Sequence, residues 1–296
     1  MIFGLAAALG WGLADFSGAI AGRKVGSIVT VILGQALSLT FMTVLLLAVG
    51  PSGAIRPIVG WIALNGIFTA VAYMSHYRAL ELGPVAVVSP IGAAYAVVGV
   101  ALAMVVLDER PAPLQLVGAA VTIVGVMLVS TDLKKLRAGT HGVPPGLPWA
   151  IVAAVSFGVA AFMLGYASQE AGWISGLWAS RAAQVACYVP VAFVYRRQLA
   201  ALRPGPGVWI ALAAGAADIL GVTTYAAGAE RGYLSIVLAA SAVFPMIAVL
   251  LSIRYLHERL VTNQVVGLAL VISGLLLLGI GDRVAGWFDG AAAMIV

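Results

Sequence analysis

Long apolar stretches alternate with short polar connectors along almost the whole chain. Each stretch is about 20 residues long, which is the length of helix that crosses about 30 Å of hydrocarbon. The stretches cover residues 2–22, 28–49, 58–79, 84–106, 112–131, 148–168, 174–195, 208–229, 233–254 and 262–281. The pattern predicts an all-α integral membrane protein with ten transmembrane helices, surrounded by a lipid bilayer.

The second half of the chain repeats the pattern of the first. Residues 77–129 are echoed by residues 225–278, with residue types recurring at a separation of about 149 positions, which indicates a duplicated unit. The recurring pairs are Glu81/Glu230, Gly83/Gly232, Glu109/Glu258, Arg110/Arg259, Gln115/Gln264, Gly118/Gly267 and Gly125/Gly274. Because each half holds five spans, the second half enters the membrane from the opposite side, which gives the inverted repeat typical of secondary transporters.

The duplication predicts how the chain divides. We expect a first five-helix repeat at 1–131, a linker at 132–147, a second five-helix repeat at 148–281 and a C-terminal tail at 282–296. The linker is charged and contains Gly and a Pro pair, as surface connectors do. The tail is too short to cross the membrane again.

Prolines and glycines predict local features of the helices. Pro90, Pro190 and Pro245 lie inside apolar stretches, where proline kinks or interrupts a helix. Pro90 and Pro245 do not occupy equivalent positions in the two repeats, so the two halves are expected to bend differently. Glycines two turns apart share a helix face and predict close helix packing; these are Gly118/Gly125 and Gly267/Gly274.

The composition agrees with a membrane protein. Hydrophobic residues make up 62% of the chain and charged residues 9%, with a mean hydropathy of +1.08, whereas soluble domains have roughly 25% charged residues. The net charge of +5 comes from Lys and Arg between spans, which is typical of membrane topology and anionic lipid headgroups. We therefore expect no nucleic-acid partner.

Three ionisable residues fall deep inside apolar spans, where a charge is costly and almost always faces a partner or a wet cavity. They are Asp15 in span 1, Arg181 in span 7 and Asp218 in span 8. At 1.5 Å per residue, Arg181 is closer in depth to Asp218 than to Asp15. We therefore expect an Arg181–Asp218 ion pair and an unpaired Asp15.

The expected pairing assigns different roles to the two carboxylates. A carboxylate that is desolvated without a partner can take up a proton near neutral pH, whereas one beside a guanidinium stays ionised. Asp15 is therefore the candidate for proton or cation coupling; a hydrogen bond to a neighbouring helix is the alternative. For Arg181 and Asp218, a purely structural interhelical pair and a gate or carboxylate clamp both remain open.

Further residues are candidates for the site on weaker sequence signals. His76 is expected about 12 Å from the centre of span 3, near an interface. Trp11 and Tyr95 lie deeper in their spans and could offer π faces to a cationic or aromatic substrate. Glu109 and Glu258 are expected near the N-termini of spans 5 and 10, where negative charge complements the helix dipole. No motif in the sequence indicates a cofactor or a metal.

Three sequence elements resemble a known family. They are Ala79-Leu80-Glu81-Leu82-Gly83-Pro84 at a span end, Glu-Arg between spans (Glu109-Arg110 and Glu258-Arg259), and Gly118-Ala119 followed by Gly125-Val126. Together they resemble the EamA domain of the drug/metabolite transporter superfamily, and Trp11-Gly12 is similar to an element of that family's first span. The resemblance covers both halves. It implies ten helices in two inverted repeats and transport of amino acids, drugs, nucleobases or other small metabolites.

The charge distribution and the family resemblance predict opposite orientations of the chain in the membrane. The side that holds both termini carries about four Lys and Arg, and the other side about eleven, so the positive-inside rule places both termini outside. The family resemblance implies both termini in the cytoplasm. The charge count is preferred here.

These observations favour a secondary active transporter for a small metabolite, amino acid or drug-like molecule, cationic or zwitterionic, with a proton as a candidate coupling ion. The expected location is the bacterial inner membrane. An enzyme is not expected, because HExxH, GxSxG and comparable catalytic motifs are missing from the sequence. A receptor or scaffold, or a channel without coupled transport, is the alternative. The sequence does not determine the oligomeric state.

Overall fold

The computed structural model describes residues 1–83, 85–130 and 145–256, together with 262–263, 265–267, 269–274 and 276–277 in the last apolar stretch. Within these residues every regular element is a helix. The first half contains α1 (Ile2–Val25), α2 (Ser27–Val49), η1 (Arg56–Ile58), α3 (Val59–Leu82), α4 (Val85–Ala93), α5 (Tyr95–Val106) and α6 (Pro113–Ser130). The second contains α8 (Leu147–Ala171), α9 (Trp173–Val194), α10 (Arg196–Ala200), α11 (Pro206–Arg231), α12 (Leu234–Ser241) and α13 (Phe244–Leu256).

The all-helical membrane architecture is confirmed. Six segments of the described chain are long and apolar enough to cross a membrane: α1, α2, η1 with α3, α8, α9 and α11. Shorter apolar helices run over 91–106, 113–125, 234–247 and 265–274. The figure of ten transmembrane helices, which counts each of these shorter segments as a further crossing, stays a prediction.

The outside of the bundle is apolar and its inside contains charges. Leu47 is 80% exposed and Val105 82% exposed, while Arg181 and Asp218 are each 2% exposed. This distribution is the reverse of what water favours, because exposed apolar side chains and buried charges are both costly there. The helical bundle is therefore suited to a lipid bilayer, with a polar interior.

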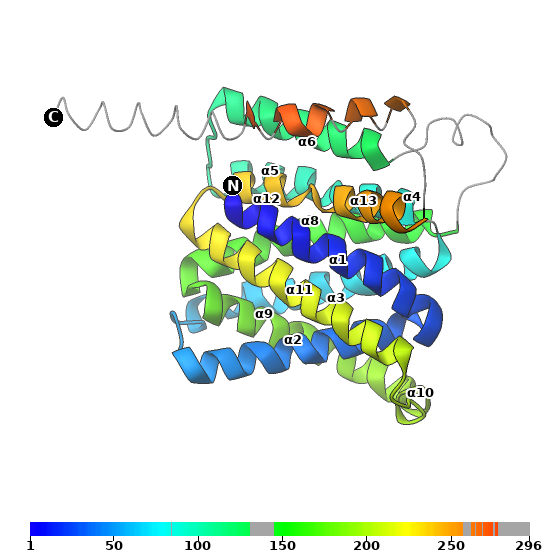
Figure 1. Ribbon diagram of the computed structural model, residues 1–296. Helices are drawn as coiled ribbons and strands as arrows, with labels where there is room; N and C mark the ends of the chain where they lie inside the picture. Colours follow the sequence, from blue (N-terminus) through cyan, green and yellow to red (C-terminus); the bar gives the residue numbers. More distant parts are fainter. Residues whose placement is uncertain are drawn as a thin grey trace.

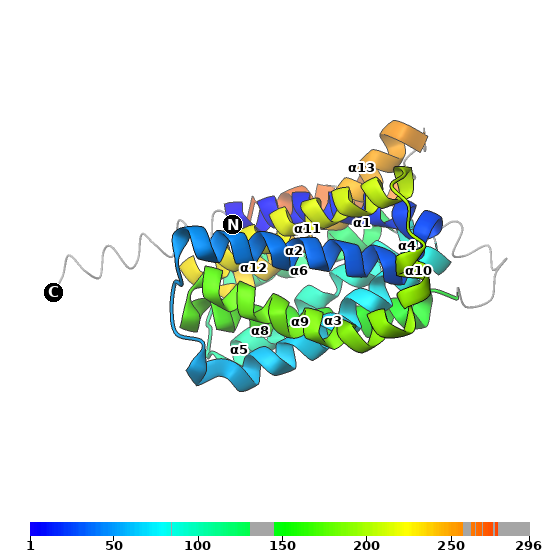
Figure 2. The same cartoon turned by 90° about the horizontal axis from the view of Figure 1, so that it is seen from below.

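The first helices of the two halves run in opposite directions. In Figure 1, α1 runs from the left-hand end of the bundle to the right, and α8 begins at the right and runs to the left. The halves also interleave, since α1 lies against α11 and α3 lies against α8. Figure 2 shows the same bundle from below, with its helices side by side. Opposed first helices are the arrangement that an inverted repeat requires.

Two spans are broken at equivalent positions. The first break, at Ala94, separates α4 from α5, and the second, at Ala242 and Val243, separates α12 from α13. Tyr95 and Phe244, which begin α5 and α13, are equivalent in the sequence repeat. The expectation of different bends is therefore wrong for the positions of the breaks. The prolines are placed differently around them: Pro245 lies in the first turn of α13, directly after the second break, whereas Pro90 lies within α4, before the first. α9 continues through Pro190 to Val194.

Glycines allow the two halves to approach closely, as the sequence predicted. A Cβ atom on Gly125 would lie 2.6 Å from the backbone N of Val271, and one on Gly274 would lie 2.7 Å from the carbonyl oxygen of Gly118. Helix α6 of the first half therefore packs directly against the described part of the last apolar stretch. These contacts need residues without side chains.

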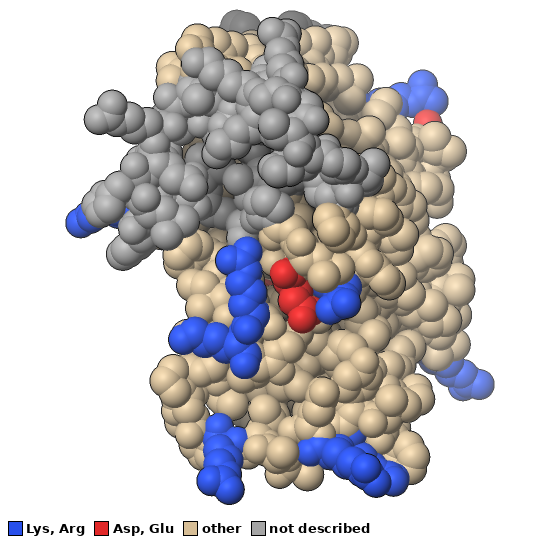
Figure 3. Space-filling model, turned by 90° about the vertical axis from the view of Figure 1, so that its right-hand side faces the viewer, with Lys and Arg blue, Asp and Glu red and all other residues tan. Residues whose placement is uncertain are grey.

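Positive charge is visible at the right-hand end of the bundle. Figure 3 looks at this end and shows Lys and Arg around a mostly uncharged surface, with part of it covered by residues outside the description. The last turn of α1 contributes Arg23 and Lys24, and α10 contributes Arg196 and Arg197. Other cations in the charge count, among them those of the linker, lie outside the described residues. The membrane orientation stays a prediction.

Candidate functional site

A cavity of about 90 Å³ lies in the middle of the bundle, between the two halves. Its wall includes residues of α1, α3, α5, α8, α9, α11 and α13, with Gly92 from α4. All six candidates from the sequence contribute to its lining: Trp11, Asp15, His76, Tyr95, Arg181 and Asp218. A space of this size holds several water molecules, so it suits a small molecule.

The expected ion pair between spans 7 and 8 is present. A terminal nitrogen of Arg181 on α9 lies 2.9 Å from Oδ2 of Asp218 on α11, and each side chain is 3% exposed. Two buried opposite charges compensate each other, whereas either one alone would carry a large desolvation cost. Because both residues line the cavity, the pair places a compensated charge at its wall.

Uncharged polar side chains complete this cluster. The Arg181 guanidinium donates hydrogen bonds to Oε1 of Gln35 at 2.5 Å and to Oε1 of Gln184 at 2.7 Å. The Tyr73 hydroxyl donates to Asp218 and lies 3.4 Å from a guanidinium nitrogen of Arg181. Sequence reasoning missed Gln35 and Gln184. Their signal was a buried amide inside an apolar span, which needs a polar partner.

Asp15 is not unpaired, which corrects the sequence prediction. Its Oδ1 atom lies 2.8 Å from Nε2 of His76, and its Oδ2 atom accepts a hydrogen bond of 2.7 Å from the Ser89 hydroxyl. His76 is 4% exposed and lines the cavity, so it lies inside the bundle, and its depth relative to the membrane interface stays a prediction. Helix α3 continues to Leu82, beyond the span end assumed at residue 79, so His76 lies closer to the middle of its helix than the assumed span suggested.

The Asp15–His76 pair leaves one ring nitrogen without a partner. Nδ1 of His76 is buried and makes no hydrogen bond to any described residue. Where the Asp15 carboxylate is ionised it can only accept a hydrogen bond, and Nε2 of His76 then carries the hydrogen between them. Nδ1 is then an acceptor in the neutral ring and a donor in the protonated ring. In the described structure, Nε of Arg181 and the Ser180 hydroxyl are likewise buried without partners.

Aromatic rings form another part of the cavity wall. Trp11 lies 6.1 Å from Tyr95, 5.5 Å from Tyr225 and 6.5 Å from Phe244, measured between ring centroids. The Tyr95 hydroxyl is hydrogen-bonded to the Ser241 hydroxyl at the break of the opposite half. Trp11 and Tyr95 thus line the cavity, and their contact with a substrate stays a prediction.

Glu109 complements a helix dipole, but not that of the helix that follows it in the chain. Its two carboxylate oxygens accept hydrogen bonds from the backbone N–H groups of Leu234 at 2.7 Å and Ser235 at 3.0 Å. These groups form the first turn of α12, where the partial positive charge of a helix lies. Glu109 therefore joins the first half to the second. The prediction for Glu258 falls outside the described residues.

The described residues contain no group of three or more His, Cys, Asp or Glu side chains that could hold a metal ion. The polar chemistry available at the cavity is therefore that of the two charged pairs, amides and hydroxyls. A bundle of apolar helices with opposed halves around a buried cavity that carries ionisable side chains is an arrangement found in many secondary transporters.

Comparison with known proteins identifies the family. The sequence model described as the EamA-like transporter family matches residues 1–131 and 144–280. The chain therefore belongs to the EamA-like transporter family, whose members are generally transporters. No curated protein matches the chain by sequence.

A solved structure shares the fold. It is a crystal structure described only as that of a protein, and it superposes with a TM-score of 0.73 at 19% sequence identity. The superposition covers 96% of this chain and 97% of the other. At this identity the similarity concerns the fold alone.

Proposed function

We propose that this protein is a secondary active transporter that moves a small cationic or zwitterionic molecule across a membrane by alternating access, with a proton as its coupling ion. The observation that supports the proposal most directly is the buried cavity that carries both the Asp15–His76 pair and the Arg181–Asp218 pair. An ionisable side chain inside a membrane bundle is by default a candidate for a substrate or ion pathway.

The charges at the cavity favour a cation or a zwitterion. Arg181 and Asp218 compensate each other, so Asp15 supplies one excess negative charge whenever His76 is neutral. An uncompensated negative charge in a low-dielectric cavity attracts a proton or a positive group. A zwitterion would place its positive group beside Asp15 and its acceptor group toward the unpartnered Nε of Arg181.

The Asp15–His76 pair supports proton coupling by competition. Uptake of one proton by the pair cancels the excess negative charge, and a cationic substrate bound at Asp15 does the same. The two therefore exclude each other, and this exclusion is the basis of exchange. Two directly hydrogen-bonded titratable groups take up the proton as a unit, so the coupling belongs to the pair.

The fold supports alternating access about this cavity. Two five-span repeats at 1–131 and 148–281, inverted with respect to each other, would rock around a site at their interface, and the broken spans would lie against that site. The ten-helix count, the repeat boundaries and the bacterial inner membrane as the location belong to this proposal.

Reconstitution in liposomes tests the proposal. Purified protein is reconstituted into liposomes, and a panel of small cations and zwitterions is added outside. Uptake into the liposomes is measured with and without a pH gradient, with protein-free liposomes as the control. Saturable uptake that the pH gradient drives is the expected result. Binding without uptake would indicate a receptor or scaffold, and uptake unaffected by the pH gradient and not saturable would indicate a channel; either would contradict the proposal.

A further inference from the structure

A second hollow lies at the end of the bundle that holds the N-terminus. It is lined by Phe3, Glu109, Arg231, Tyr233 and Val237, among others, and we refer to it as the N-terminal vestibule. Arg231 lies over the ring of Phe3 at 5.4 Å from its centroid. The vestibule shares none of its lining residues with the central cavity.

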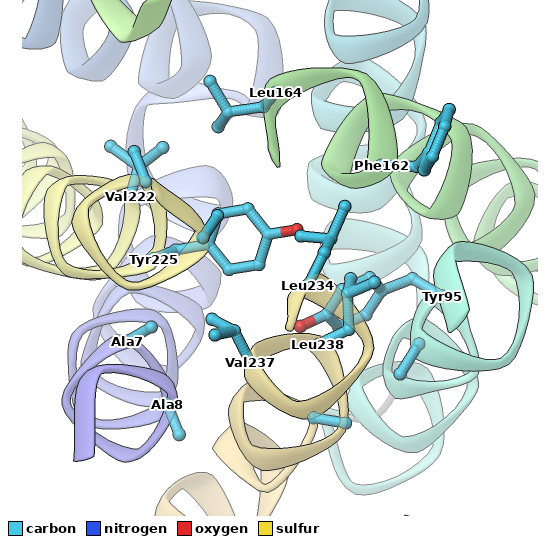
Figure 4. Close-up of a cluster of buried hydrophobic side chains, with 14 of the residues drawn as sticks. Ala7, Ala8, Tyr95, Phe162, Leu164, Val222, Tyr225, Leu234, Val237 and Leu238 are labelled. Atoms are coloured by element: carbon cyan, nitrogen blue, oxygen red, sulfur yellow. The ribbon is translucent and has the colours of Figure 1, made fainter. Parts of the chain in front are cut away.

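Apolar side chains lie between the vestibule and the cavity, and we refer to five of them as the plug: Leu164, Tyr225, Leu234, Val237 and Leu238. Leu164 and Tyr225 line the cavity, Val237 lines the vestibule, and all three belong to one buried cluster with Leu234 and Leu238. Figure 4 shows Tyr225 of α11 beside Leu234, Val237 and Leu238 of α12. Leu234 and Leu238 are fully buried. A hydrophobic constriction of this kind blocks polar solutes.

Glu109 ties the plug to the opposite repeat. It lies just beyond α5 in the first half, and it holds the first turn of α12 through two hydrogen bonds. Helix α12 carries three of the plug residues, Leu234, Val237 and Leu238. Both bonds are assisted by the charge of the carboxylate, which makes them stronger than neutral ones. Glu109 is 9% exposed, so water competes little for its oxygens.

A second link between the repeats lies at the same end. Ser52, in the connector after α2, donates its backbone N–H to the Ser175 hydroxyl at 2.9 Å, and its own hydroxyl accepts the Ser175 N–H at 3.1 Å. Ser175 lies in the first turn of α9. At 1.5 Å per residue it is about 8 Å along the helix from Ser180, which lines the cavity.

We propose that these two links, Glu109 with the N-terminus of α12 and Ser52 with Ser175, form the gate that closes the cavity toward the N-terminal vestibule. Both join one repeat to the other, and rocking of inverted repeats must break such links on one side of the membrane. Each consists of a few hydrogen bonds, so it can form and break within a transport cycle. This proposal rests on the proposed transport function.

A reversible cross-link tests the gate. The Ser52 and Ser175 hydroxyl oxygens lie 3.4 Å apart, a separation compatible with a disulfide between cysteines at these positions. The variant Ser52→Cys/Ser175→Cys is made in a Cys187→Ala background, because Cys187 is the single cysteine of the chain, and the background alone receives the same oxidant as the control. Oxidation should reduce uptake at least tenfold, and a reductant should restore it.

The outcomes separate the gate from the transport function. Undiminished uptake by protein that mass spectrometry shows to be cross-linked would overturn the gate while leaving the transport function intact. Failure of the reduced variant and of the native protein to take up any substrate would overturn the transport function, and the gate with it.

A labelling experiment tests the gate without uptake. Leu238→Cys in the Cys187→Ala background places a thiol in the plug, and its rate of reaction with a hydrophilic thiol reagent measures opening. Adding Glu109→Gln, which leaves one of the two α12 N–H groups without an acceptor, should accelerate labelling severalfold. Glu230→Gln, which alters a partly exposed carboxylate 3.6 Å from Arg231 at the same end, should not. Equal rates in both variants would overturn the gate.

Discussion

The Asp15 carboxylate and the His76 ring meet at 2.8 Å, and their side chains are 8% and 5% exposed. One residue comes from α1 and the other from α3, so the contact joins two helices of the first repeat at the cavity wall. A proton added to either group changes the hydrogen bond between them and the charge that faces the cavity. The other ring nitrogen of His76, Nδ1, is buried without a partner among the described residues.

Asp15→Asn should abolish uptake driven by a pH gradient. The amide keeps the shape of the side chain and an oxygen that can accept from His76, but it does not titrate and removes the excess negative charge. Uptake at several external pH values, with and without a gradient, measures the effect. The melting temperature should stay close to that of the native protein. Unchanged proton-driven uptake would assign Asp15 to structure and exclude it from coupling.

Asp218→Asn should destabilise the protein by about 3–5 kcal/mol, because it leaves the buried Arg181 guanidinium without a compensating charge. The double variant Arg181→Gln/Asp218→Asn removes both charges and keeps groups that can hydrogen-bond, so it should recover at least half of that loss. Unfolding by SDS titration in mixed micelles gives the free energies of unfolding. A double variant less stable than the single one would show that the charge pair is not the source of the effect.

Sequence patterns predicted the architecture because the membrane imposes it. Apolar length gave the helices, and the recurrence of residue types gave the duplication, since both follow from rules that act along the chain. The Arg181–Asp218 pair was also predictable, because α9 and α11 follow each other in the chain with only the short α10 between them and the two depths overlap. Close packing at Gly125 and Gly274 was predictable as well, because glycines two turns apart on one helix face are visible in the sequence.

The contacts that the sequence did not predict depend on packing between distant segments. The separation of Asp15 and His76 by 61 positions gives no local signal that the two side chains meet. Gln35 meets Arg181 across 146 positions. The breaks at Ala94 and at Ala242 and Val243 occupy equivalent places in the two repeats, which prolines at non-equivalent positions did not predict.

The close contact between α1 and α11 provides a stability test of the interface between the halves. A Cβ atom on Gly10 would lie 2.4 Å from the backbone N of Gly221 and 2.7 Å from the carbonyl oxygen of Ala217. Backbone atoms in the middle of a helix cannot move aside as the tip of a flexible side chain can. Gly10→Ala must therefore push α1 away from α11, and the two helices belong to different repeats.

Gly60→Ala is the matched control for this substitution. Gly60 also lies in a helix, is exposed, and has no atom within 4 Å of an added Cβ. Alanine favours a helix by about 1 kcal/mol over glycine, so Gly60→Ala should leave stability unchanged or slightly raised. Gly10 lies in the interior of α1, where this propensity gain applies in full, but Gly10→Ala should lose about 1–3 kcal/mol to overpacking, seen as a lower melting temperature in detergent. Equal melting temperatures for the two variants would show that α1 and α11 are not held at this distance.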